Sequence, residues 1–140
     1  MALEDLYKEI VIEHYQHPKH HGHLEHFEAK AEGSNPLCGD EIGIELQFDG
    51  DVIKQIMFTG GGCSISQSAI DMLADIVKGK STTEIHKIIE EYKKMLQGEQ
   101  HDPDIIGDLE ALSEVKKYPA RVKCASLSYA VLEQAINQKK

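Results

Sequence analysis

The chain has 140 residues, of which 41% are hydrophobic and 28% are charged, and its formal net charge is −9. This length suits one globular domain that buries a core without disulfide bonds. The acidic balance argues against broad nucleic-acid binding, because neutralising phosphates needs a surface rich in lysine and arginine. No apolar run approaches the roughly 20 residues that span a bilayer, so we expect no membrane segment. We expect a cytoplasmic protein with reduced cysteines.

The first half of the chain predicts a helix followed by a small antiparallel sheet. Apolar side chains recur at helical spacing over residues 3–15. Residues 42–48 alternate between apolar and polar side chains, as in a half-buried strand, and Asp49-Gly50 predicts a tight turn into a second strand over residues 52–58. Because a two-stranded ribbon alone is only marginally stable, residues 27–32 are expected to add a third strand.

The segment between the first helix and the sheet is rich in histidine. Six of the eight histidines lie there: His14, His17, His20, His21, His23 and His26. Such a cluster could bind a metal, but no cysteine or closely spaced acid completes a site. We therefore predict a solvated link, in which His14 alone contacts the apolar face of the helix.

The second half predicts mainly helices. The glycines at 60–62 are expected to end the preceding strand and to let the chain approach a metal closely; they lack the Gly-Lys-Ser/Thr ending of a phosphate loop. Helices are predicted over residues 65–79, after a capping box at Ser81–Glu84 up to Gly98, near residues 109–115, and from Pro119 to Ile136. A charged face of the second of these helices is expected only to aid solubility: Glu90, Glu91, Lys93 and Lys94.

Three cysteines in three separate segments are candidate metal ligands. An odd number leaves one thiol unpaired in any disulfide scheme, whereas Cys38, Cys63 and Cys124 together with Asp40 complete a tetrahedral zinc shell. Cys38 and Asp40 point to the same side of an extended segment, and Gly39 lets the backbone bend between them. Cys63 and Cys124 are both expected near helix N-termini, where the helix dipole favours a thiolate. From the residues alone, three buried structural cysteines remain the alternative.

Two cations flank Cys124. A centre of three thiolates, one carboxylate and a divalent metal carries net negative charge, which Arg121 and Lys123 could offset. They could equally attract an anionic sulfur species. For Arg121, a structural salt bridge is an equally good interpretation of the spacing.

Three motifs together resemble the IscU/SufU/NifU N-terminal family: Asn-Pro-x-Cys-Gly-Asp at 35–40, Gly-Gly-Gly-Cys-Ser-Ile-Ser at 60–66 and Arg-x-Lys-Cys-Ala-Ser-Leu at 121–127. The likeness runs from about Leu3 to Ile136. It implies one α+β domain over residues 1–140, with a small three-stranded antiparallel sheet packed against helices. Family members work in iron–sulfur cluster assembly with a cysteine desulfurase, either as the scaffold for the cluster or as the acceptor of its sulfur.

Two departures favour the SufU-type branch of this family, which is a zinc-dependent sulfur acceptor. Lys123 stands where the scaffold branch usually carries histidine, and an ammonium group cannot bind a metal while protonated. The stretch around residues 98–115 resembles an insertion that the scaffold branch lacks. A sulfur acceptor of this kind is sulfurtransferase-like rather than a stand-alone enzyme, and a zinc hydrolase is disfavoured because four ligands leave no open position for water.

The resemblance also implies residue roles and partners. Cys38, Asp40, Cys63 and Cys124 would bind one zinc ion, Cys38 would accept the sulfur, and Arg121 would be a site cation, with Gly39 and Lys123 beside the shell. The partners would be a SufS-type cysteine desulfurase and downstream iron–sulfur assembly proteins. Our hypothesis is that a partner group displaces the mobile Cys38 from zinc and so frees its thiolate. The alternative is iron, or a transient [2Fe–2S] cluster, on the same cysteines.

Overall fold

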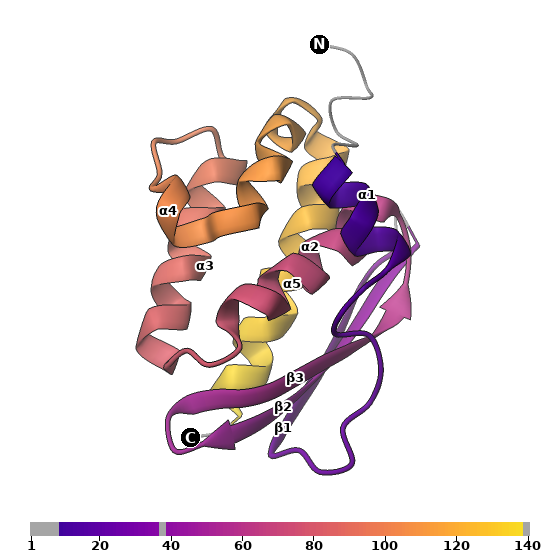
Figure 1. Ribbon diagram of the computed structural model, residues 1–140. Helices are drawn as coiled ribbons and strands as arrows, with labels where there is room; N and C mark the ends of the chain where they lie inside the picture. The colour runs from indigo at the N-terminus through magenta and orange to yellow at the C-terminus, as the bar shows by residue number, and fades with distance from the viewer. Residues whose placement is uncertain (1–8, 37–38, 139–140) are drawn as a thin grey trace.

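The computed structural model describes residues 9–36 and 39–138, which form helices packed against a single sheet (Figure 1). The elements, in chain order, are α1 (Glu9–Gln16), β1 (Ala29–Asn35), β2 (Asp40–Asp49), β3 (Val52–Gly61), α2 (Ser64–Val77), α3 (Thr82–Leu96), α4 (Pro103–Ile106), the 3-10 helix η2 (Gly107–Lys117) and α5 (Pro119–Asn137). The α+β fold expected from the sequence is confirmed.

The sheet has three antiparallel strands in the order β1-β2-β3. The predicted turn joins β2 to β3, and Gly50 there has the left-handed φ of +63° that such a turn requires. The third strand is present but displaced: β1 begins at Ala29 rather than at residue 27 and continues to Asn35, which pairs with Asp40. The sheet therefore ends at the first cysteine motif.

The helices gather on one side of the sheet (Figure 1). Helix α2 contacts β3, α5 contacts β1 and β2, and α3, α4 and η2 pack against these two helices or against one another. Alternation along β2 turns Ile42, Ile44 and Leu46 toward the core. Nearly all of α2 is buried, so it is the central element of the fold. None of the described helices is long and apolar enough to cross a membrane.

The histidine segment is more structured than the sequence predicts. His14 is buried as expected, and its Nδ1 lies 2.6 Å from Oδ2 of Asp71, a fully buried residue of α2. His20 is buried as well, and its backbone N–H donates to Oδ1 of Asp71 at 2.9 Å. The prediction of a merely solvated link is wrong for His20, because an acid more than 50 positions away along the chain supplies its partner.

The charged face of α3 also departs from its prediction, most clearly at Glu91. Glu91 is only 4% exposed and accepts hydrogen bonds from the Asp102 backbone N–H at 2.9 Å and from the Lys94 ammonium at 3.1 Å. Lys87 lies 3.1 Å from the same carboxylate. Glu91 therefore connects α3 to Asp102, the residue that precedes α4, and does more than aid solubility.

Candidate metal centre

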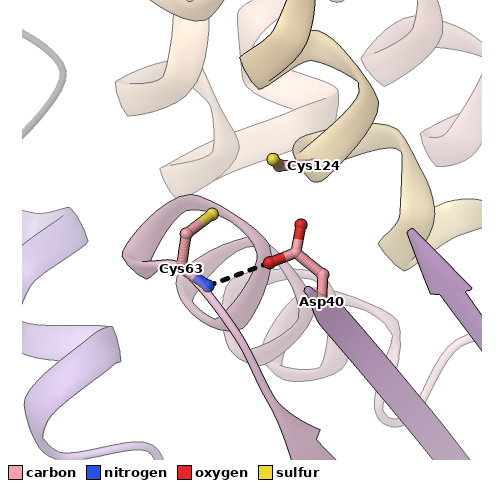
Figure 2. A group of neighbouring side chains, drawn as sticks. All are labelled: Asp40, Cys63 and Cys124. Carbon is pink, nitrogen blue, oxygen red and sulfur yellow. Dashed lines mark hydrogen bonds between the residues drawn. The ribbon is translucent and has the colours of Figure 1, made fainter. Parts of the chain in front are cut away.

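Three of the four predicted metal ligands meet at the end of the sheet. Asp40 is the first residue of β2, Cys63 is the N-cap residue of α2, and Cys124 lies in α5. One donor atom from each side chain lies within 4.8 Å of the other two. Figure 2 shows the two sulfur atoms and the carboxylate turned toward a common space between the three elements.

The two carboxylate oxygens of Asp40 differ in their hydrogen bonding. The residue is fully buried, and its Oδ1 accepts the backbone N–H of Cys63 at 2.9 Å (Figure 2). Its Oδ2 is also buried but has no hydrogen-bond partner among the residues that the structure describes. Because leaving a buried carboxylate oxygen unsatisfied is costly, a cation at Oδ2 would compensate it.

Cys63 lies where the sequence predicts, at the junction of strand and helix. It is half-buried, and its Sγ accepts the backbone N–H of Ser66 at 3.4 Å, in the manner of an N-cap side chain. The helix start thus fixes the position of a sulfur atom that can bind a metal.

Cys124 lies in the first turns of its helix, as predicted. The helix α5 begins at Pro119, the start that the sequence indicates. Cys124 is fully buried in the second turn, and its Sγ donates to the carbonyl oxygen of Ala120 at 3.5 Å. Its backbone N–H lies past the first turn, where the free N–H groups of a helix are.

The glycine run ends the strand as expected, although β3 extends to Gly61, the second glycine of the run. The expected close approach does occur at Gly62. This residue has φ +151°, and a Cβ built on it would collide with Oδ1 of Asp40 and lie 2.9 Å from the Asp40 Cα. Only glycine lets residues 62 and 63 reach the carboxylate, so Gly62 belongs to the site even though it offers no ligand atom.

The remaining predicted site residues are placed only in part. Cys38 lies outside the described residues, although it falls between Asn35 and Asp40, which pair across β1 and β2. Gly39 is exposed and has the left-handed φ of +71° that a bend would use. Arg121 is half-buried and Lys123 is exposed, both within one turn of Cys124. Their roles stay predictions.

Two polar residues beside the centre are absent from the sequence-based set. Ser66 and Gln67 are buried in the first turn of α2 and hydrogen-bond to one another and to the backbone of Cys63 and Glu41. The sequence contains a faint signal for Ser66, because it is the last residue of the motif at 60–66 that also contains Cys63.

A known protein family matches most of this chain. The model of the NifU-like N-terminal domain matches residues 6–125. The chain belongs to the NifU-like N-terminal domain family. Within this family, it is 37% identical to the zinc-dependent sulfurtransferase SufU of Bacillus subtilis (strain 168) over 135 residues, covering 96% of this chain and 91% of SufU.

Other members of the NifU-like N-terminal domain family are equally similar but bear a different name. The chain is 38% identical to the iron–sulfur cluster assembly scaffold protein IscU of Streptococcus pyogenes serotype M1, covering 97% of this chain and 86% of IscU. The crystal structure of FiSufU from Fervidobacterium islandicum AW-1 superposes with a TM-score of 0.91 at 32% identity, covering 96% of this chain and 99% of FiSufU. These relatives share the fold, and their names divide between a sulfurtransferase and scaffold proteins of iron–sulfur cluster assembly.

The donor atoms fit a zinc ion. Zinc bonds to thiolate sulfur at about 2.3 Å and to carboxylate oxygen at about 2.0–2.2 Å, so donors that share one ion lie about 3.5–4 Å apart. The three donors here all lie within 4.8 Å of one another, so a small closing movement brings them to that spacing. Two sulfurs and one oxygen leave one tetrahedral position for a fourth ligand.

Proposed function

We propose that this protein takes part in iron–sulfur cluster assembly as a zinc-dependent sulfur acceptor. It would receive persulfide sulfur from a cysteine desulfurase in the cytoplasm and pass it to downstream assembly proteins. The observation that carries the proposal is the buried Oδ2 of Asp40, which has no hydrogen-bond partner in the described part of the chain and lies beside the thiols of Cys63 and Cys124. The 37% identity to SufU, a protein named as a zinc-dependent sulfurtransferase, supports it.

In this proposal, Asp40, Cys63 and Cys124 hold the zinc ion and Cys38 is the fourth ligand. The ion stabilises the thiolate form of its cysteine ligands, as zinc does in proteins generally. Asp40 keeps Oδ2 available because Oδ1 is occupied by the Cys63 N–H. Cys63 and Cys124 are fixed at a helix cap and inside a helix, whereas Cys38 lies between two strand ends and is the ligand that can leave with least disturbance of the fold.

Cys38 would then perform the transfer as a nucleophile. Its thiolate attacks the terminal sulfur of the desulfurase persulfide, a new sulfur–sulfur bond forms on Cys38, and the bond to the desulfurase cysteine breaks. The desulfurase cysteine departs as a thiolate, so no external oxidant or reductant is consumed. Arg121 is proposed to stabilise the anionic persulfide, and the exposed Lys123 to add positive charge nearby.

The proposal is tested by mapping the transferred sulfur. The protein is incubated with a cysteine desulfurase and sulfur-labelled cysteine, and persulfides are located by mass spectrometry of alkylated peptides. We expect the label on Cys38 and its loss in Cys38→Ala, together with loss of desulfurase stimulation. Asp40→Ala is expected chiefly to lower zinc retention. Full stimulation and continued labelling in Cys38→Ala would exclude the assignment.

The second candidate function is a scaffold that assembles a transient [2Fe–2S] cluster on the same cysteines. The identity of 38% to a protein named as the IscU scaffold favours it. Lys123 argues against the scaffold function, because an ammonium group beside Cys124 supplies no metal ligand. Anaerobic reconstitution with iron and sulfide separates the two: a stable and transferable cluster at stoichiometric yield supports the scaffold, and its absence supports the acceptor.

The proposal also covers the region that resembles an insertion. Residues 98–115 include α4 and most of η2, which lie against α3. We propose that this segment distinguishes the acceptor branch within a single domain.

A further inference from the structure

The first turn of α2 holds an unusual pair of buried polar side chains. Ser66 is fully buried and Gln67 is 8% exposed, at the start of a helix whose buried residues are mostly apolar. Buried hydroxyl and amide groups destabilise a fold unless they are hydrogen-bonded, so the partners of these two residues show what they support.

Ser66 connects to Cys63 in two ways. Its backbone N–H donates to the Cys63 Sγ at 3.4 Å, and its hydroxyl donates to the Cys63 carbonyl oxygen at 3.1 Å. The hydroxyl also lies close to Gly62, since a Cβ at that glycine would be 3.0 Å from the Ser66 Oγ. The side chain of Ser66 therefore supports the two residues that precede the helix.

Gln67 joins this contact to the strand that carries Asp40. Its Nε2 donates to the Ser66 hydroxyl at 3.2 Å and, through a longer contact of 3.5 Å, to the Glu41 carbonyl oxygen. Glu41 follows Asp40 in β2. A short chain of hydrogen bonds thus runs from the strand that carries one candidate ligand, through two buried side chains, to the backbone of another.

We propose that Ser66, supported by Gln67, is a positioning residue of the metal centre. Its hydroxyl fixes the backbone of Cys63, whose N–H in turn holds Oδ1 of Asp40. The Cys63 carbonyl oxygen also accepts the Gln67 backbone N–H at 3.2 Å, so the Ser66 hydroxyl adds a second hydrogen bond to the backbone that positions two ligands. Residues that orient ligands in this way commonly change metal affinity by about 10–100-fold when they are mutated. This inference rests on the zinc site of the proposed function.

The same helix turn offers a matched control. Ser68 is as fully buried as Ser66, but its hydroxyl donates to the carbonyl oxygen of Ile65 and to no ligand. Ser66→Ala and Ser68→Ala therefore remove the same group from the same helix at equal burial. Any general effect of deleting a buried hydroxyl on the stability of α2 is expected in both variants.

The test is the zinc dissociation constant, measured by competition with a chromophoric chelator for the wild type and both variants. We expect Ser66→Ala to bind zinc at least about tenfold more weakly and Ser68→Ala to match the wild type. The ligand-field bands of the cobalt-substituted protein are expected to change only in Ser66→Ala. Ser66→Thr should restore both readouts, because a threonine hydroxyl can also bond the carbonyl three residues earlier.

Two further measurements separate a loss of ligand positioning from a general loss of folding. Melting temperatures of the metal-free proteins show whether the two alanine variants remain folded to the same extent, and Gln67→Met, which keeps the side-chain length, gives an independent loss of the supporting amide. Equal zinc affinity in Ser66→Ala and Ser68→Ala would overturn the positioning role while leaving the zinc site intact. If the wild type does not bind zinc, the proposed zinc-dependent function is wrong, and so is the positioning role of Ser66.

Discussion

Gly62 shows how one residue without a side chain shapes the centre. Its φ of +151° lies in a region that L-residues rarely adopt, and its Cα faces the Asp40 carboxylate. Gly62→Ala is expected to destabilise the protein by about 1–3 kcal/mol and to lower the zinc content, because either the backbone or Asp40 must move. Chemical denaturation and metal analysis measure the two effects.

The neighbouring glycine supplies the control for this prediction. Gly61 has no atom within 4 Å of a Cβ built on it, and its φ is not in the left-handed region. Gly61→Ala should therefore leave zinc content and stability near those of the wild type. If both alanine variants lost zinc equally, the close approach at Gly62 would not be the cause.

At the same scale, the sequence predicts which side chains meet better than it predicts their surroundings. The motifs name Asp40, Cys63 and Cys124 as candidate ligands, and the fold brings their donor atoms together. Ser66 and Gln67 were not chosen, because serine and glutamine are unremarkable in a helix until the fold buries them. Which oxygen of Asp40 is free also depends on tertiary contacts with residue 63, which no local pattern contains.

At the scale of elements, a buried hydrogen bond joins α1 to α2. The His14 Nδ1 lies 2.6 Å from the Asp71 Oδ2, and the two side chains are 4% and 0% exposed. His14→Ala leaves the buried Asp71 side chain without this partner, so we expect a loss of about 1–3 kcal/mol in the free energy of unfolding. Urea denaturation measures it. His17→Ala alters an exposed histidine of the same segment and should change stability little; similar losses in both variants would contradict the role of the pair.

The hydrogen bonds that Glu91 makes between α3 and the residues before α4 predict that the stability of the protein depends on pH. The Asp102 backbone N–H, with Lys87 and Lys94, lowers the pKa of Glu91 from the ordinary 4.5 to about 2. A carboxyl with a lowered pKa in the folded state stabilises the protein above its unfolded pKa, and this contribution disappears as pH falls from about 4.5 toward 2. Glu91→Gln should therefore be less stable than the wild type at pH 7, and the difference should shrink over that window.

Glu90→Gln is the control for the pH series. Glu90 is exposed and lies 3.4 Å from the same Lys94. An ion pair of this kind on the surface contributes little, so this variant should follow the wild type throughout. A constant difference between Glu91→Gln and the wild type from pH 7 to pH 3 would show that the carboxylate charge is not what holds this junction.

The elements themselves were predicted with unequal success, for physical reasons. The capping box at Ser81 and Glu84, the turn at Gly50 and the proline that begins α5 were all identified, because each is a local signal with a local structural cause. The ends of β1 and β3 were misplaced. Pairing with β2 extends both strands through residues of weak strand propensity, such as Gly33, Gly60 and Gly61.

At the scale of the whole molecule, the metal centre lies where a sheet end meets two helices. Each of the three elements contributes one candidate ligand, so the site exists only when β2, α2 and α5 are docked. Zinc binding would therefore stabilise the native state by mass action. We expect the melting temperature to rise when zinc is added to the metal-free protein, and to rise much less in Cys63→Ser. An equal rise in both proteins would place the ion elsewhere.

Three cysteines and one aspartate are proposed to bind one zinc ion. X-ray absorption at the zinc edge, recorded on protein purified without added metal, tests it most directly. We expect stoichiometric zinc with three sulfur neighbours at about 2.3 Å and one oxygen or nitrogen neighbour at about 2.0–2.2 Å. Little zinc together with stoichiometric iron and inorganic sulfide, or a zinc shell without sulfur, would contradict the account.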